Sequence, residues 1–185
     1  IDTGVTGIAY ETVTASDGSM PLLAPMSTIA GQLAFTVGSY HLLKFNKGKG
    51  VMIGHLENIE PRTVTVIGAG VAGTQSILKS VENKAFVQVV DSSEIKLNEL
   101  RSTFGDENIK YILSTPESIR ESISKSDLVI GSVYVVGKEA PKVVTKDMLS
   151  SMSPGTVMVD VSIDQGGCFE TSKPTTHDNP TFIKD

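Results

Sequence analysis

Residues Gly68 to Gly73 read GAGVAG and have the GxGxxG spacing of a loop that binds a dinucleotide. In such a loop the first glycine allows a tight turn, the second lets a pyrophosphate approach the backbone, and the third lets the following helix pack close to the strand. The first N–H groups of that helix and its positive dipole end then face the anion. The motif alone is weak evidence, but here it leaves a predicted strand and opens a predicted helix, which is the context that it requires.

Asp91 ends the next predicted strand, roughly 20 residues after the first glycine, where a carboxylate accepts hydrogen bonds from the adenosine ribose hydroxyls. Ser92 and Ser93 follow it, so no arginine is placed to bind a 2′-phosphate, which favours NAD over NADP. Lys96, one helical turn further on, would weaken that preference. The alternative is that the glycines only pack and that Asp91 caps the next helix; the strand, helix and acid taken together favour a cofactor site.

Two further carboxylates, Asp160 and Asp164, lie at the end of the last predicted strand, in the run VMVDVSIDQGG. Ligands of parallel sheets bind beyond the carboxyl ends of the strands, so Asp164 would face the nicotinamide half of the cofactor. There it could accept a proton or bind an amine or a water molecule, but a plain turn in which Asp164 caps the next segment fits the spacing equally well. Asp160, inside the apolar run, is predicted to be a buried, hydrogen-bonded structural acid.

The remaining polar candidates predict no metal site. His41, His55 and His177 have no partners at metal-ligand spacing, so surface or packing roles are expected for all three. The single cysteine, Cys168, cannot form an internal disulfide, which fits a reducing cytoplasm. It follows two glycines and is expected to be a small packed residue rather than a reactive thiol.

The elements that would position these residues alternate regularly from Thr63 onward. Short β-branched runs predict strands at 64–67, 86–90, 111–112, 127–133 and 156–163, and amphipathic stretches predict helices at 71–82, 93–103, 116–124 and 145–152. This alternation predicts right-handed crossovers and a doubly wound, Rossmann-type α/β fold with a parallel sheet covered on both faces. Before it, residues 1–13 are expected to be extended, and a long helix with an apolar face is expected from Ser27 to about Phe45.

The composition of the 185 residues limits the partners. The net charge is −5 and the pI is about 5.2, which argues against nucleic acid or an anionic membrane surface as the main partner. No apolar run approaches the roughly 20 residues of a membrane span, and the first residues lack the pattern of a signal peptide. The sequence begins at Ile1 rather than methionine, so it is expected to be a piece of a longer protein.

Four stretches resemble the alanine dehydrogenases and their relatives, the nicotinamide nucleotide transhydrogenases. They are PLLAPMSTIAGQLAFTVGSYHLL (21–43), VTVIGAGVAGTQS (64–76), DLVIGSVYVVGKEAPKVVT (127–145) and VMVDVSIDQGGCFETSKPTTHDNPTF (157–182). The glycine loop is generic, whereas APMSTIAG, GKEAPKVVT and above all IDQGGCFE are specific. The GKEAPKVVT run and the cysteine after DQGG resemble the alanine dehydrogenase branch more than the transhydrogenase branch.

The resemblance implies reversible oxidative deamination of L-alanine to pyruvate and ammonia, with NAD as hydride acceptor. It implies Asp164 as the acidic catalytic residue and assembly as a homo-oligomer, commonly a hexamer. The implied cofactor contacts are Ser27 and the glycine loop (Gly68, Gly70, Val71, Gly73) at the phosphates, Asp91, Lys96 and Ser114 on the adenosine side, Val133 and Tyr134 in the cleft, and Val161 near the nicotinamide.

Family members are considerably longer, and no residue here matches their substrate-binding arginine and lysine or their catalytic histidine. The resemblance therefore implies that residues 1–20 are a remnant of another domain, 21–45 a loop and an interdomain connecting helix, and 46–185 the dinucleotide-binding domain, unable to turn over alone. Two other functions remain open. One is the NAD-binding component of a proton-translocating transhydrogenase, and the other is a non-enzymatic nucleotide-sensing module, since fold does not dictate function.

Overall fold

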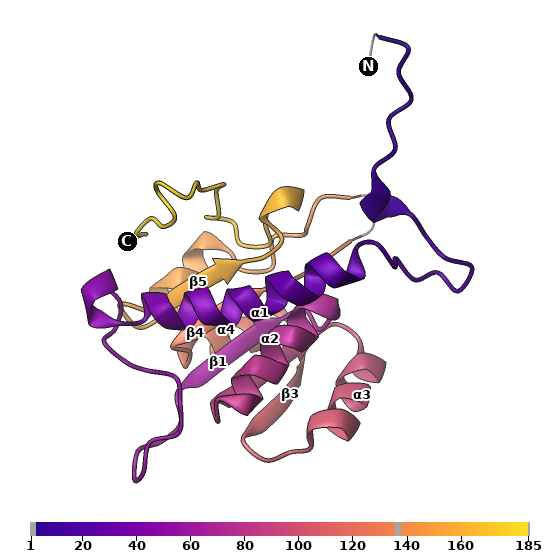
Figure 1. The fold of residues 1–185 in the computed structure, drawn as a ribbon. Coiled ribbons are helices and arrows are strands. Elements are labelled where there is room, and N and C mark those ends of the chain that lie inside the picture. The colour runs from indigo at the N-terminus through magenta and orange to yellow at the C-terminus, as the bar shows by residue number, and fades with distance from the viewer. Residues whose placement is uncertain (1–2, 136–137, 185) are drawn as a thin grey trace.

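Five parallel strands form the sheet of the computed structural model, which describes residues 3–135 and 138–184 (Figure 1). The strands are β1 (Thr63–Ile67), β2 (Phe86–Asp91), β3 (Ile109–Leu113), β4 (Leu128–Gly131) and β5 (Val157–Asp160). Their order is β3-β2-β1-β4-β5, with every neighbouring pair parallel. The first strand, β1, therefore lies at the centre of the sheet. The strands β2 and β3 lie on one side of it, and β4 and β5 lie on the other. This confirms the predicted doubly wound α/β fold.

Helices cover both faces of the sheet. They are α1 (Ala24–His41), α2 (Val71–Glu82), α3 (Glu94–Phe104) and α4 (Pro116–Ser124). Side chains of α1, α2 and α3 bury one face of the sheet, in a core that includes Phe35, Ile77 and Val66. On the other face α4 and a 3₁₀ helix (Lys146–Ser151) form a second core around Ile123 and Val129. Figure 1 shows α1 and α2 crossing in front of the sheet.

Local sequence explains where these helices begin and end. Gly70 precedes α2, and Ser93 caps α3 by accepting a hydrogen bond from the Lys96 N–H. The α4 helix begins with a capping box, in which the Thr115 and Ser118 side chains each accept a backbone N–H of the other residue. These caps lie directly after the strands, so each strand leads into its crossover helix through a short turn.

The long helix α1 lies against α2 because small residues allow close approach. A Cβ at Gly31 would lie 2.1 Å from the Ala72 carbonyl oxygen in α2, and a Cβ at Gly38 would lie 2.5 Å from Leu128 Cδ1 in β4, so α1 also approaches the sheet closely. The Ser76 hydroxyl donates to the Gly31 carbonyl across the same contact, at 2.8 Å. The helix begins before the expected Ser27 and ends at His41, and residues 44–46 form a separate 3₁₀ turn.

Several boundaries predicted from sequence are wrong. The expected helix at 145–152 is the 3₁₀ helix Lys146–Ser151, because extended backbone at Thr145 and Met152 leaves too few residues for two α-helical turns. The expected strands 127–133 and 156–163 shorten to β4 and β5, because the Ser132 side chain bonds to the glycine loop after β4 and a turn begins at Val161 after β5. Residues 10–12 form a 3₁₀ turn in an otherwise irregular and exposed arm.

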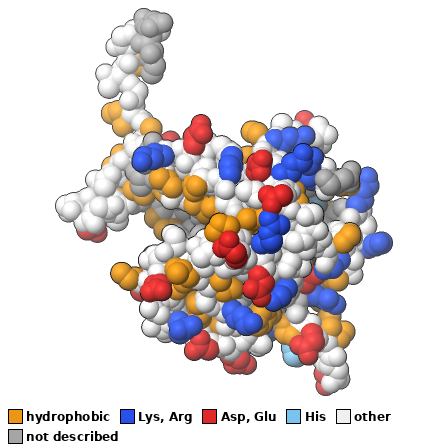
Figure 2. All heavy atoms as spheres, turned by 180° about the vertical axis from the view of Figure 1, so that it is seen from behind, with side chains coloured by type: hydrophobic (Ala, Val, Ile, Leu, Met, Phe, Trp, Pro, Cys, Tyr) orange, Lys and Arg blue, Asp and Glu red, His pale blue; other side chains and the backbone are white. Residues whose placement is uncertain are grey.

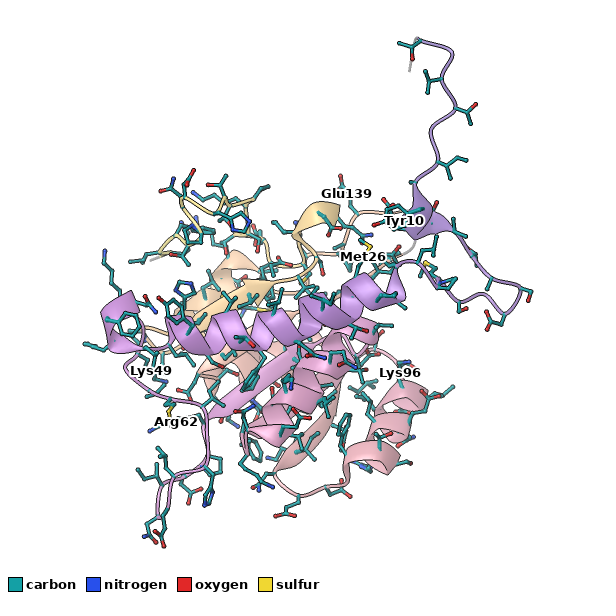
Figure 3. The ribbon with its side chains drawn as sticks, viewed as in Figure 1. Tyr10, Met26, Lys49, Arg62, Lys96 and Glu139 are labelled. Atoms are coloured by element: carbon teal, nitrogen blue, oxygen red, sulfur yellow. The ribbon has the colours of Figure 1, made fainter. Side chains whose placement is uncertain are left out.

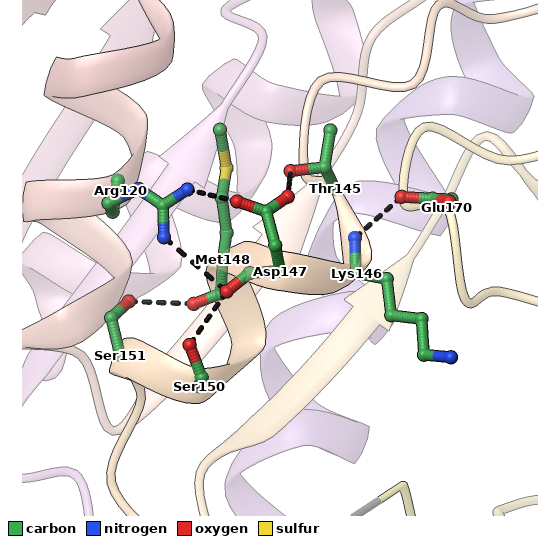
Figure 4. A network of polar contacts seen from close by, with 8 residues as sticks. All are labelled: Arg120, Thr145, Lys146, Asp147, Met148, Ser150, Ser151 and Glu170. Atoms are coloured by element: carbon green, nitrogen blue, oxygen red, sulfur yellow. Dashed lines mark hydrogen bonds and ion pairs between the residues drawn. The ribbon is translucent and has the colours of Figure 1, made fainter.

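A polar network fixes the 3₁₀ helix against α4 (Figure 4). The Arg120 guanidinium pairs with the Asp147 carboxylate, which also accepts from the Thr145 hydroxyl, while Ser150 donates to the Asp147 carbonyl at 2.7 Å. The hydrogen bonds from Thr145 and then from Arg120 hold the pKa of the exposed Asp147 carboxyl below its ordinary value. These contacts join the start of the 3₁₀ helix to Arg120 in α4.

An ion pair and a hydrogen bond stabilise the opposite edge of the sheet, where the strands begin. Lys49 pairs with Asp127 at 2.7 Å, and Asp127 also accepts the Thr63 N–H at 3.1 Å. Figure 3 shows Lys49 and Arg62 at this edge, away from Lys96 and Met26.

Acidic and basic side chains are interspersed on the face shown in Figure 2. None of the described helices is long and apolar enough to span a bilayer.

Candidate cofactor-binding site

The turns that follow the strands meet at one edge of the sheet. Backbone hydrogen bonds tie each turn to its neighbour: Gly68 N–H donates to the Val90 carbonyl at 2.8 Å, Ser132 to Ile67 at 2.8 Å, Ser114 to Asp91 at 2.9 Å and Val161 to Gly131 at 2.8 Å. Because the strands are parallel, their carboxyl ends share this edge, as the sequence predicts. The predicted residues Gly68, Asp91, Ser114, Val133 and Val161 are brought there together.

The three glycines of the loop have different surroundings. Gly68 has φ +93°, in the left-handed region that favours glycine, and a Cβ there would lie 2.7 Å from the Ser132 carbonyl oxygen. A Cβ at Gly73 would lie 1.9 Å from the Gly68 carbonyl oxygen. A Cβ at Gly70, in contrast, would meet no atom within 4 Å. Gly68 and Gly73 therefore serve packing, while Gly70 leaves open space in front of the backbone.

That open space lies at the N-terminus of α2. Gly70 is the N-cap of the helix and has no side chain to accept the first N–H groups. These groups and the positive end of the helix dipole are available to an anion that approaches over Gly70. Val71, the first helical residue, is half exposed beside it. The arrangement fits the pyrophosphate of a dinucleotide.

Asp91 supports the glycine loop directly, a role that the sequence argument missed. Its Oδ2 accepts the Ala69 N–H at 2.7 Å, and its Oδ1 accepts the Ser93 N–H at 2.8 Å. The cap of α3 is Ser93, so Asp91 is not the helix cap that the alternative required. Nothing in the spacing of Asp91 distinguished a ribose contact from a contact to the loop, because both need a carboxylate at the end of β2.

Ser132 is a second contributor that the sequence argument missed. Its hydroxyl contacts the carbonyl oxygens of Gly68 at 2.7 Å and Ile67 at 3.2 Å, and its side chain is buried. It thereby fixes the turn between β1 and the glycine loop. The sequence feature that could have revealed this role is a small hydroxyl residue directly after Gly131. The sequence-based prediction placed Ser132 inside the strand 127–133 instead.

The other predicted cofactor residues surround this edge. Ser27 lies in the first turn of α1, one turn before Gly31, whose neighbour is Ala72 in α2. Lys96 is near the N-terminus of α3, and its ammonium lies 3.8 Å from Glu99 (Figure 3). Tyr134 is exposed, with its hydroxyl 3.9 Å from the Met20 sulfur. Ser114 and Val133 are half buried.

The two carboxylates of the last strand have different environments. Asp160 accepts N–H groups of Ser162 at 3.1 Å, Cys168 at 2.9 Å and Phe169 at 3.1 Å. This is the hydrogen-bonded role predicted for Asp160, although the residue is half buried rather than buried. Asp164 is exposed, in a 3₁₀ turn (Ile163–Gln165) that follows β5. Asp160 therefore shapes the loop, and Asp164 is the acid that a ligand could reach.

Cys168 is buried beneath this loop, as predicted for a packed residue. Burial, and then the charge of Asp160, raise the pKa of its thiol from 9.0 to about 12. Since the thiolate is the reactive form, the thiol is expected to be inert in the folded protein.

We expect iodoacetamide at about pH 8 to leave Cys168 unmodified in the native protein and to alkylate it fully in guanidinium chloride. The neutral thiol also stabilises the fold fully below pH 9.0, and that contribution is lost as the pH rises toward 12. Mass spectrometry of the peptide around Cys168 measures the modification. Rapid alkylation of the folded chain would contradict the buried position.

The two surface hollows found among the described residues lie away from the glycine loop. Two surface hollows, of about 340 and 440 Å³, lie between α3 and β3 and between α4 and the 3₁₀ helix, and neither is lined by a residue of the glycine loop. Among the described residues no cluster of three His, Cys, Asp or Glu side chains is arranged to hold a metal ion. The carboxyl edge therefore offers backbone N–H groups, the Gly70 opening and the carboxylates Asp91 and Asp164.

Known proteins are similar to this chain over all or most of its length. Residues 34–185 match the family described as "Alanine dehydrogenase/PNT, C-terminal domain". An alanine dehydrogenase of Halomonas elongata is 48% identical over 185 residues, which are 100% of this chain and 50% of that protein. The chain thus spans about half the length of the curated relatives that it matches.

Two solved structures are similar. An L-alanine dehydrogenase superposes with a TM-score of 0.91 at 39% identity, covering 96% of this chain and 49% of the other. A transhydrogenase from Sinorhizobium meliloti has a TM-score of 0.74 at 27% identity, covering 89% and 49%. The match to the alanine dehydrogenase is the stronger in both fold and sequence, and the chain belongs to the family of alanine dehydrogenase and transhydrogenase C-terminal domains.

Proposed function

We propose that this chain is the NAD-binding domain of an alanine dehydrogenase, which interconverts L-alanine with pyruvate and ammonia. The observation that carries the proposal is the Gly70 opening at the N-terminus of α2, with the Asp91 carboxylate bonded to the same loop. A Cβ placed at Gly70 would meet no atom within 4 Å, so the space in front of this backbone is open to an anion. The names of the relatives support alanine as the substrate.

The proposed cofactor is NAD rather than NADP. Asp91 ends β2 beside the glycine loop, where its negative charge would repel a 2′-phosphate and its oxygens could accept ribose hydroxyls. The residues proposed to hold the phosphates are Ser27 and the loop Gly68–Gly73, with Val71 at its turn. Lys96 and Ser114 are proposed on the adenosine side, Val133 and Tyr134 in the cleft, and Val161 near the nicotinamide.

Bound NAD would accept the hydride from the α-carbon of alanine, leaving an imine that water hydrolyses to pyruvate and ammonia. Asp164 is proposed to act as the acid–base group at this stage, because it is exposed beyond the end of β5 and has a carboxylate that can hold a water molecule or an amine. Asp160 is proposed to hold the backbone of the loop through the N–H groups that it accepts. Residues outside this chain would bind the substrate carboxylate.

We propose further that the full protein acts in the cytoplasm as a homo-oligomer, by resemblance a hexamer. The single buried cysteine suits a reducing compartment. The exposed face of α1 carries Ile29, Leu33 and Tyr40, which suits a helix covered by other protein. Residues 1–20, 21–45 and 46–185 are proposed as the arm of another domain, the connecting helix with its preceding loop, and the cofactor domain.

The test is the oxidation of NADH by the natural full-length polypeptide that contains this chain. We expect a loss of absorbance that requires both pyruvate and ammonium, with NADPH a much poorer substrate. A transhydrogenase component would instead pass hydride to an NADP analogue without pyruvate, and the solved transhydrogenase match makes that the second candidate. Saturable NADH binding without either reaction would favour a nucleotide sensor.

A further inference from the structure

The segment before the 3₁₀ helix lies along the loop that carries Asp164. Ala140 N–H donates to the Gln165 carbonyl at 2.9 Å, and Val143 N–H donates to the Cys168 carbonyl at 2.8 Å. Val144 then forms a parallel bridge with Phe169. The segment 140–144 therefore forms one wall of the loop 163–169. It belongs to the GKEAPKVVT run, which no proposed cofactor or substrate contact explains.

Lys142 makes the side-chain contacts across this wall. Its ammonium donates to the carbonyl oxygen of Gly167 at 2.6 Å and to that of Gly166. An ammonium carries three N–H donors, and hydrogen bonds from a charged donor are about twice as strong as neutral ones. One side chain thus fixes the direction of two successive peptide groups.

The two glycines are held by contacts within the turn and by Lys142 outside it. Gly166 has φ +86° and Gly167 has φ +77°, both in the left-handed region. Their N–H groups bond within the turn, Gly166 to the Ile163 carbonyl at 3.1 Å and Gly167 to the Ser162 carbonyl at 2.9 Å, whereas their carbonyl oxygens accept from Lys142. Because glycine populates many backbone conformations, the Lys142 contacts add to the bonds that hold this turn. Asp160 accepts the N–H groups of Ser162, Cys168 and Phe169, and Lys142 donates to the carbonyl groups of Gly166 and Gly167. Along the chain, Asp164 therefore lies between a residue bonded to Asp160 and a residue bonded to Lys142.

We propose that Lys142 is a positioning residue for Asp164, acting through the glycine turn without touching NAD or the substrate. The proposal rests on the proposed function, in which Asp164 is the acid–base group of the reaction. Loss of the ammonium would let the two glycine peptides rotate and would displace the carboxylate. A displacement of about 1 Å at a reacting group lowers the rate by roughly 100-fold.

The experiment compares three variants of the full-length polypeptide: Lys142→Met, Lys142→Arg and Lys146→Met. Lys146 is a matched control, because it lies four residues after Lys142, at the start of the 3₁₀ helix, and its side chain extends away from the polar network in Figure 4, while its backbone N–H bonds to Glu170. We expect Lys142→Met to lower kcat for alanine oxidation by about 10- to 100-fold, with the KM for NAD changed less than about twofold. Lys142→Arg should restore most of kcat, since a guanidinium offers several N–H donors.

Amide hydrogen exchange of the same proteins provides a readout that does not depend on activity. We expect peptides covering 163–169 to exchange at least about tenfold faster in Lys142→Met than in wild type or Lys146→Met, since hydrogen bonds from the charged ammonium are lost. Unchanged exchange in this loop overturns the proposal, and so does a raised KM for NAD with an intact kcat. A wild-type enzyme without alanine activity refutes the proposed function, whereas exchange still decides whether Lys142 fixes the loop.

Discussion

Replacing Gly70 with alanine is expected to weaken NADH binding by about 30- to 100-fold while leaving the fold unchanged. An added Cβ meets no atom of the chain within 4 Å, and Gly70 has φ −68°, which alanine adopts without strain. The methyl group would instead occupy the space through which a pyrophosphate reaches the N–H groups of α2. Fluorescence titration with NADH measures the binding, and thermal unfolding of the same samples measures the stability.

The matched control is Gly31→Ala, whose Cβ would lie 2.1 Å from the Ala72 carbonyl oxygen. This substitution forces α1 away from α2 and is expected to lower the free energy of unfolding by about 1–3 kcal/mol. The two variants therefore separate a glycine required by a ligand from a glycine required by packing. If Gly70→Ala bound NADH as tightly as the unaltered chain, the pyrophosphate would have to lie elsewhere.

The central strands could be predicted from sequence because burial on both faces gives them continuous apolar, β-branched runs. Val64, Val66, Val87 and Val89 are all fully buried. Strand ends were less predictable, because they depend on tertiary contacts. Ser132 suits a strand by position, yet its hydroxyl turns to the Gly68 carbonyl oxygen, and β4 ends before it.

The site was predictable in its location but not in its supporting contacts. Parallel strands bring the residues after their carboxyl ends together whatever the loops contain, so Gly68, Asp91 and Val161 could be placed from the chain order alone. The bonds from Ala69 to Asp91 and from Lys142 to Gly167 join residues 22 and 25 positions apart. Sequence periodicity carries no information about such pairs, because their geometry is set by loop conformations.

Replacing Asp164 with asparagine in the full-length polypeptide is expected to lower kcat for alanine oxidation by about 100- to 10,000-fold, the usual range for a lost acid–base group. Binding of NADH should be unchanged, because Asp164 is exposed and the glycine loop is bonded to Asp91 instead. Stopped-flow absorbance gives the rate, and the NADH titration gives the affinity. An Asp164→Asn enzyme with full turnover would remove this residue from the chemistry.

Asp160→Asn is the control that separates a shape-determining acid from a catalytic one. Its carboxylate oxygens accept the N–H groups of Ser162, Cys168 and Phe169, and an amide that replaces one oxygen with a donor cannot accept them all. We expect Asp160→Asn to lower the free energy of unfolding by about 2 kcal/mol, whereas Asp164→Asn leaves it unchanged. Because the two acids are four residues apart and the substitutions are chemically identical, opposite effects on stability and turnover would assign one to the loop framework and the other to the reaction.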